Sequence, residues 1–148
     1  MMKIGICSDH RGFYMKKILA EYLEHEGYEV EDYGTDSTES VDFPEYAFVL
    51  GRNVVRKKVD RGIAICGTGI GMSIALNKLK GIYCAKVNTI NETVLCRQHN
   101  DANVIAISAD LDEDLAREIV DKFLETKFLE DAKYKRRNKM IKDIEKNG

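Results

Sequence analysis

Short apolar runs alternate with longer amphipathic stretches along almost the whole chain, and this alternation restricts the possible folds strongly. Each amphipathic stretch has apolar residues at helical spacing. Repeated strand–helix units predict a parallel sheet covered by helices on both faces. The five apolar runs that we interpret as strands are residues 3–7 (KIGIC), 28–34 (YEVEDYG), 61–66 (RGIAIC), 82–87 (IYCAKV) and 103–108 (NVIAIS).

Right-handed crossovers leave few arrangements for such a sheet. We expect a flavodoxin-like, Rossmann-type three-layer α/β sandwich with five parallel strands in the order 2-1-3-4-5. Residues 1–148 form a single domain in this interpretation, because the length suits one hydrophobic core and no linker or internal repeat is visible. An extra charged helix at about 133–146 follows the last strand–helix unit.

Composition excludes several classes of function. Hydrophobic residues make up 44% of the chain and charged residues 32%, with a net charge of -2, so nothing favours nucleic acid as a partner. No apolar run approaches the roughly 20 residues of a membrane span. The first residues lack the features of a signal peptide, and we therefore expect a cytoplasmic protein. Among the four cysteines there is no C-x-x-C pair, so neither a zinc site nor a dithiol redox motif is suggested.

The charge is distributed unevenly. Residues 133–148 contain seven basic and two acidic residues and so carry a net charge of +5. A run of this kind is most often the solvated face of a helix. Here the helix follows the last core segment and has few apolar residues, so it is also a candidate to pack on a partner subunit and supply cations to an anion site there.

The most unusual stretch is Cys66-Gly67-Thr68-Gly69-Ile70-Gly71, which joins an expected strand to an expected helix. It matches neither G-x-G-x-x-G nor a P-loop. Its backbone N–H groups can converge on an anion at the helix N-terminus, although a plain tight turn explains the glycines equally well. A cysteine beside such N–H groups favours the thiolate form and can act as a nucleophile or a base. The alternative for Cys66 is a buried thiol at the end of a strand.

Two further polar clusters are candidates. Residues 8–11 (SDHR) follow the first strand, at the sheet edge where open α/β proteins bind ligands. A cap for the first helix is the alternative for Asp9, and a surface role is the alternative for His10. Residues 97–101 (RQHND) precede the fifth strand, so they would have to reach the site by another route, such as across a subunit boundary.

Together these residues resemble a known family. The stretches SDHRGF, DFPEYA, ICGTGIGMSIALNK and RQHNDANV are similar to those of the type B ribose-5-phosphate isomerases and the related galactose-6-phosphate isomerases of the lactose pathway. The likeness covers nearly the whole chain in the right order. It implies a metal-independent aldose–ketose isomerase without a cofactor. It also implies a homodimer, or a pair of such dimers, in which two subunits share each active site.

The resemblance implies catalytic roles for four side chains. Cys66 matches the base that moves a proton between C1 and C2 of the open-chain sugar, here between ribose 5-phosphate and ribulose 5-phosphate. Thr68 matches a group that holds the enediolate oxygen. His99 matches the residue that opens the sugar ring, and Asp9 would bind hydroxyls or assist that opening.

It also implies a set of substrate-binding residues. The N–H groups of the loop glycines would help to hold the enediolate oxygen, and the other members would contact the sugar or its phosphate. Members of this set are Gly67, Gly69, Gly71, Asn100, His10, Lys133 and Arg137.

The chain departs from the family's pattern at several positions. Some relatives carry a glutamate base where this chain has Met72, so Cys66 keeps the role. A phosphate-binding arginine common after the fifth strand is absent, since the segment reads Ser108-Ala109-Asp110-Leu111. Lys133 replaces a second such arginine and loses its bidentate geometry, with Lys135 or Arg136 as possible compensation. Phe43 replaces the usual tyrosine.

These departures leave the expected chemistry intact but open the choice of sugar. Galactose 6-phosphate, allose 6-phosphate or an unphosphorylated aldose are the nearer alternatives to ribose 5-phosphate. A non-catalytic module that binds a sugar phosphate is the more distant one.

Overall fold

The computed structural model describes residues 2–147 and contains the expected alternation of strands and helices. Helix α2 begins beside Pro44, which suits the first turn of a helix because proline has no N–H to leave unpaired. In chain order the elements are β1 (Lys3–Ser8), α1 (Phe13–His25), β2 (Glu29–Asp32), α2 (Phe43–Val55), β3 (Arg61–Cys66), α3 (Ile70–Asn77), β4 (Cys84–Lys86), α4 (Ile90–Asn100), β5 (Val104–Ser108), α5 (Glu113–Glu125) and α6 (Ala132–Asn147).

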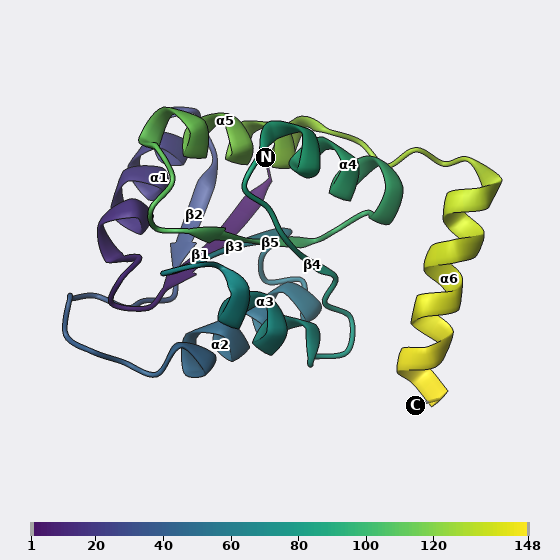
Figure 1. The fold of residues 1–148 in the computed structure, drawn as a ribbon, viewed down its shortest axis with the longest axis horizontal. Helices are drawn as coiled ribbons and strands as arrows, with labels where there is room; N and C mark the ends of the chain where they lie inside the picture. Colours follow the sequence, from purple (N-terminus) through teal and green to yellow (C-terminus); the bar gives the residue numbers. More distant parts are fainter. Residues whose placement is uncertain (1, 148) are drawn as a thin grey trace.

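The strands form one parallel sheet between two layers of helices, which confirms the predicted three-layer α/β architecture (Figure 1). Helices α1, α4 and α5 contribute to the core on one face of the sheet, and α2 and α3 contribute to the core on the other. The carboxyl ends of β1, β3 and β5 therefore open onto one edge of the sheet, between the two helical layers.

The strand order is 2-1-3-5-4, so the predicted order 2-1-3-4-5 is wrong in its last two positions. Strand β5 pairs with both β3 and β4. Its four residues from Val104 to Ile107 are all fully buried, and a strand that is apolar on both faces suits the interior of a sheet. Strand β4 has only three residues, all partly exposed, and such a short strand suits an edge.

Two glycines allow helix α2 to lie close to the sheet. The fully buried side chain of Leu50 fills the space where Gly5 and Gly62 lack a side chain. A Cβ atom at Gly5 would lie 2.7 Å from Leu50 Cδ1, and one at Gly62 would lie 3.1 Å from it. This contact holds α2 against the first and third strands, and α2 in turn begins at Phe43, beside the edge of the sheet that carries the glycine loop.

We expect Leu50→Ala to lower the free energy of unfolding by about 2–5 kcal/mol, because it opens a cavity above two glycines that cannot fill it. Chemical denaturation measures the change. Val49→Ala is the matched control on the same helix, since Val49 is 42% exposed, and it is expected to change stability by no more than about 0.5 kcal/mol. Equal losses for the two variants would contradict this account of the packing.

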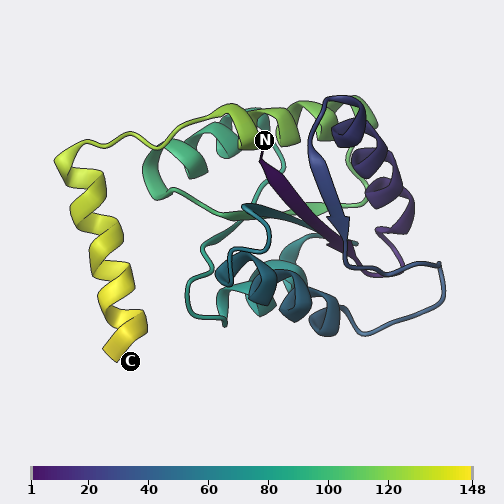
Figure 2. The ribbon, with the colours of Figure 1, turned by 180° about the vertical axis from the view of Figure 1, so that it is seen from behind.

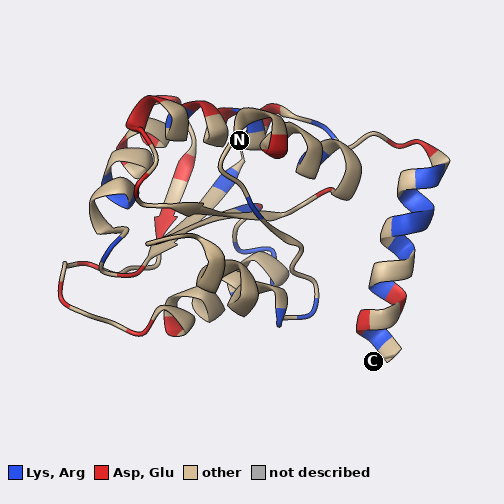
Figure 3. Cartoon of the chain, viewed as in Figure 1, with Lys and Arg blue, Asp and Glu red and all other residues tan. Residues whose placement is uncertain are grey.

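Helix α6 projects from the rest of the chain as an arm after an extended segment (Figures 1 and 2). None of its residues is buried. Near the middle of the arm, Asn138 donates a hydrogen bond to the carbonyl of His99 at the end of α4. Near the far end, Glu145 accepts hydrogen bonds from Gly81 N–H at 2.9 Å and from the Tyr83 hydroxyl at 2.7 Å. The first half of the arm is strongly basic (Figure 3). Within residues 2–147 the structure has no helix long and apolar enough to cross a bilayer.

Candidate active site

Three loops meet at the carboxyl edge of the sheet, as expected for the first two polar clusters. In the strand register Cys66 lies opposite Ser108, so the loops after β3 and β5 leave the sheet side by side. Backbone hydrogen bonds continue this order past the strands, from Asp9 N–H to Ile65 C=O at 3.1 Å and from Ala109 N–H to Cys66 C=O at 2.9 Å. Asp9, Cys66 and Ser108 are thus brought to one place by the topology.

The sulfur of Cys66 is held at the start of α3. The side chain is 5% exposed, and its Sγ accepts a hydrogen bond from Gly69 N–H at 3.1 Å. A backbone donor at a helix N-terminus stabilises negative charge on the group it faces. The sulfur of Cys66 is therefore both a buried group at the end of a strand and the acceptor of a backbone donor at a helix start.

The other three cysteines are in surroundings that keep them protonated. Burial raises the pKa of the Cys7 and Cys84 thiols far above the usual value, and it raises the pKa of Cys96 to about 11. At neutral pH these thiols are neutral and behave as small apolar groups. Cys66 is therefore the candidate nucleophile or base among the four.

Each glycine of the loop lies close to a different neighbour. A Cβ atom at Gly67 would overlap the guanidinium of Arg11, and one at Gly71 would lie 2.7 Å from Cζ of Phe43. Gly69 has a φ of 83°, a left-handed conformation that favours glycine, at the N-cap of α3. The loop is therefore a tight turn, which was the structural alternative for the glycines. It also directs the N–H of Gly69 at the sulfur of Cys66.

Free donors remain around this turn. The hydroxyl of Thr68 is exposed, and its Oγ1 accepts the N–H of Ile70 at 3.1 Å. The N–H groups in the first turn of a helix have no acceptor within the helix. Within residues 2–147 the N–H of Gly71 has no acceptor, whereas that of Gly69 is already used by the sulfur. The hydroxyl of Thr68 and the N–H of Gly71 can therefore donate hydrogen bonds to a further oxygen atom.

Asp9 combines a structural contact with a free oxygen. Its side chain is buried, and Oδ1 accepts the N–H groups of Arg11 at 3.0 Å and Gly12 at 3.1 Å, which supports the turn before α1. No hydrogen bond to Oδ2 is present within residues 2–147. Next to it, Nδ1 of His10 accepts the N–H of Val41 at 3.2 Å, so the neutral ring carries its proton on Nε2. Both residues lie at the same edge as Cys66.

The residues expected from α4 and α6 lie in a second cluster. The ring of His99 stacks on Tyr134 with centroids 4.6 Å apart. The carbonyl of His99 accepts a hydrogen bond from Nδ2 of Asn138 at 2.8 Å, and Asn100 binds Oδ1 of Asn138 at 3.2 Å. Lys133 lies beside this cluster, with its Nζ 5.0 Å from the centre of the Tyr134 ring.

This second cluster lies at the opposite end of the sheet. Helix α4 ends just before β5, whose first residue Val104 pairs with Gly62 near the start of β3. The length of β5, roughly 15 Å at about 3.3 Å per residue, therefore separates the level of His99 from that of Cys66. One chain does not bring its own His99, Asn100 and α6 cations to its own sulfur.

No group of three or more histidine, cysteine, aspartate or glutamate side chains within residues 2–147 is arranged to hold a metal ion.

Comparison with known proteins decides the family. A family model described as Ribose/Galactose Isomerase matches residues 4–141. The chain is 44% identical over 129 residues to a putative sugar phosphate isomerase of Bacillus subtilis, covering 86% of this chain and 87% of the other. It is 41% identical over 146 residues to ribose-5-phosphate isomerase B of Escherichia coli, covering 98% and 97%. The chain belongs to the ribose/galactose isomerase family.

A solved structure agrees with this assignment. Ribose-5-phosphate isomerase B of Clostridium thermocellum superposes with a TM-score of 0.96 and 43% identity, covering 99% of both chains. The resemblance found in the sequence is thereby confirmed, and the protein is an isomerase of this family.

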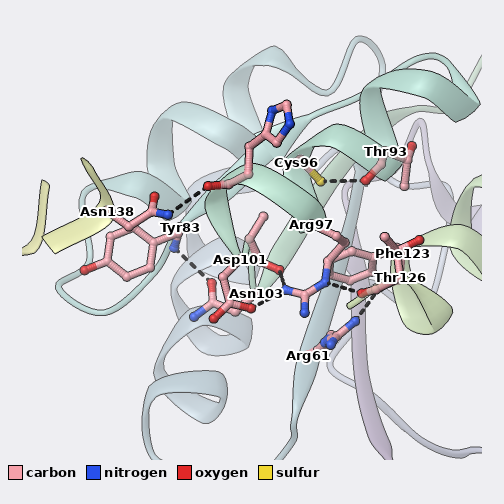
Figure 4. Close-up of polar contacts among 12 residues, drawn as sticks. Arg61, Tyr83, Thr93, Cys96, Arg97, Asp101, Asn103, Phe123, Thr126 and Asn138 are labelled. Carbon is pink, nitrogen blue, oxygen red and sulfur yellow. Dashed lines mark hydrogen bonds and ion pairs between the residues drawn. The ribbon is translucent and has the colours of Figure 1, made fainter. Parts of the chain in front are cut away.

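In this isomerase two arginines fix the place where the arm begins. Arg97 is buried and donates to the carbonyls of Ala102 at 2.7 Å and Thr126 at 3.1 Å, and it pairs with Asp101 at 2.7 Å (Figure 4). Arg61 donates to the carbonyl of Phe123. Burial and the charge of Arg97 lower the pKa of Arg61 to about 10, so it remains a cation at neutral pH. These contacts hold the end of α5 and the segment that leads to α6.

A basic groove lies between the arm and the rest of the chain. Its volume is about 690 Å³, and the residues that line it include Arg61, Arg97, Lys135, Lys139 and Lys142. Cys66 and Asp9 do not line it. The groove is therefore separate from the carboxyl edge that carries the candidate base, and the arm residues that face it differ from Lys133 and Arg137.

Arg11 is the residue of the site whose role the sequence did not predict. It belongs to the SDHR cluster, but no role was assigned to it. The guanidinium extends across the glycine loop toward Asp110, from the loop after β1 to the loop after β5. An arginine directly after an Asp-His pair at the end of a strand is a signal that could have identified it.

Proposed function

We propose that this isomerase interconverts ribose 5-phosphate and ribulose 5-phosphate, with Cys66 as the base. The observation that carries the proposal is the hydrogen bond from Gly69 N–H to Cys66 Sγ at the start of α3, in a loop where Thr68 and Gly71 have donors to spare. The names of the relatives support the choice of sugar, since those of Escherichia coli and Clostridium thermocellum are called ribose-5-phosphate isomerase B.

The reaction places demands that this loop meets. The thiolate takes the proton from C2 of the open-chain aldose, the electron pair forms the C1–C2 double bond, and charge accumulates on the C1 oxygen. Donors that already point at that oxygen lower the barrier. The hydroxyl proton of O2 passes to O1, and return of the abstracted proton to C1 then gives the ketose with its carbonyl at C2, so the base must reach both carbons from one side. A sulfur and nearby N–H groups on one short turn satisfy both conditions.

We further propose that the working enzyme is a homodimer, or a pair of dimers, in which His99, Asn100, Lys133 and Arg137 of one subunit complete the Cys66 site of the other. Two features support this arrangement. The two clusters lie at opposite ends of the sheet in one chain. The arm also exposes Met140, Ile141 and Ile144, which are 63%, 50% and 73% exposed, and exposed apolar groups of this kind mark contact surfaces.

A second candidate substrate is a six-carbon sugar phosphate. The family description includes galactose isomerases, and Asp110 places an exposed carboxylate, 80% accessible, at the carboxyl edge of the sheet. A carboxylate can accept hydrogen bonds from additional sugar hydroxyls.

Turnover of ribose 5-phosphate by the purified protein tests the proposal. We expect formation of ribulose 5-phosphate that persists in the presence of EDTA, since the proposed chemistry uses side chains and backbone donors alone. Turnover of galactose 6-phosphate or allose 6-phosphate, with none of ribose 5-phosphate, would overturn the choice of sugar. A rise in melting temperature with sugar phosphates but no turnover of any of them would indicate a binding module instead.

A further inference from the structure

Arg11 places a cation next to the catalytic loop. The carboxylate of Asp9 holds the N–H of Arg11 at 3.0 Å and so fixes the start of the side chain. The guanidinium then lies on the bare backbone of Gly67, where even a methyl group would overlap it. Gly67 directly follows Cys66, so the positive charge lies one residue from the candidate base.

The guanidinium is poorly paired in this position. Its Nη2 lies 3.9 Å from Oδ2 of Asp110, beyond hydrogen-bond distance, and the two side chains are 56% and 80% exposed. Ion pairs this exposed contribute little to stability. No hydrogen bond from the guanidinium is present within residues 2–147. Its donors are therefore free at the edge of the sheet where the sugar must bind.

We propose that Arg11 binds the anionic end of the sugar substrate, with a phosphate as the ligand, and that Asp110 competes with that phosphate for the guanidinium. This inference rests on the proposed function and adds a determinant of substrate class to it. A guanidinium matches phosphate oxygens in a bidentate geometry, and such charge-assisted pairs are among the strong hydrogen bonds of proteins. The guanidinium lies over Gly67, at the same edge of the sheet as the candidate base, so one sugar chain can meet both.

The contact with Asp110 is too weak to block the arginine. In the free enzyme the carboxylate lies 3.9 Å from the guanidinium, and a doubly charged phosphate displaces it. An unphosphorylated sugar offers no anion and gains nothing from this cation. Arg11 therefore raises the preference for phosphorylated sugars, and Asp110 reduces that preference in part because it competes for the same cation.

The competing explanation is that Arg11 only braces the glycine loop. A bracing residue would act on the position of Cys66, so its loss would lower kcat for every sugar and lower the melting temperature. A phosphate-binding residue would instead change KM and the dissociation constant for phosphorylated ligands alone.

The test compares Arg11→Ala, Arg11→Lys and Asp110→Asn with the wild type. Kinetics with ribose 5-phosphate and with ribose are measured beside calorimetric binding of ribose 5-phosphate and inorganic phosphate. We expect Arg11→Ala to weaken phosphate binding and raise KM for ribose 5-phosphate by about 10- to 100-fold with kcat little changed. Arg11→Lys should recover part of the loss, and Asp110→Asn should tighten binding by a few-fold. Arg52→Ala, an exposed arginine of α2, is the matched control and should behave as the wild type.

The outcomes separate this inference from the proposed function. Unchanged phosphate binding in Arg11→Ala would overturn the inference, and so would an equal fall of kcat for ribose 5-phosphate and ribose. If the wild type turns over no sugar, the proposed function fails, yet calorimetry with phosphate still decides whether Arg11 binds it. Melting curves of each variant establish that the fold is intact.

Discussion

Replacing Cys66 with alanine is expected to reduce turnover of ribose 5-phosphate by about 10²- to 10⁴-fold, the usual contribution of a positioned acid or base. The loss should appear in kcat, since the proposed role of the sulfur is to act on the reacting carbons and not to bind the phosphate. Loss of solvent exchange at C2 of the sugar, followed by NMR in deuterated water, would show that proton abstraction itself is impaired.

A cysteine elsewhere in the chain provides the control. Cys84→Ala removes a thiol whose pKa is raised by burial, and it should retain wild-type turnover. Turnover by Cys66→Ala within a few-fold of the wild type would show that the base lies elsewhere. Inactivation of both variants together with a lowered melting temperature would indicate general damage to the fold.

Two inactive variants should regain activity when they are combined, provided that their substitutions lie in different clusters. Cys66→Ala disables the carboxyl edge of the sheet, and His99→Asn disables the end of α4. In a mixed dimer with shared sites, each site takes its glycine loop from one subunit and its α4 residues from the other. One site therefore contains both substitutions, and the other contains neither. Random mixing makes half of the dimers mixed, so about a quarter of wild-type turnover is expected from symmetric dimers.

The matched control combines Cys66→Ala with Thr68→Ala. These residues lie on the same loop, so every site of the mixed dimer carries one substitution and no turnover should return. Mass spectrometry of the intact assembly must show that subunits have exchanged in both mixtures. Mixed dimers of Cys66→Ala and His99→Asn without recovered turnover would contradict the shared site.

Most of the fold could be predicted from the sequence, because the patterns that indicate strands and helices lie within short stretches of the chain. Apolar runs such as residues 61–66 and 103–108, each next to a helical pattern, determine a parallel sheet almost by themselves. The order of the last two strands was not accessible in the same way. It depends on how the completely buried β5 competes with the three-residue β4 for the place beside β3, and that is a property of the assembled sheet.

The candidate site was predictable to a similar degree. The positions of Asp9, His10 and Cys66 at one edge follow from chain topology, since each follows a parallel strand. The contact of Gly69 N–H with the sulfur and the course of the Arg11 side chain depend on loop conformation and on packing between loops that are distant in sequence. The sequence also could not show what the His99 side chain contacts, because α4 ends at the opposite edge of the sheet from Cys66.

The glycine loop has a consequence for how this isomerase can change over time. Its three glycines are kept free of side chains by three separate parts of the chain: Arg11 over Gly67, the backbone of β5 behind Gly69, and the ring of Phe43 against Gly71. A side chain at position 67 would displace the exposed end of Arg11, and one at 71 would press on the end of the Phe43 ring. At position 69 both the left-handed φ of 83° and the backbone of β5 oppose any side chain. Position 69 is therefore the least free of the three to change, whereas a substitution at 67 would move the cation beside the candidate base.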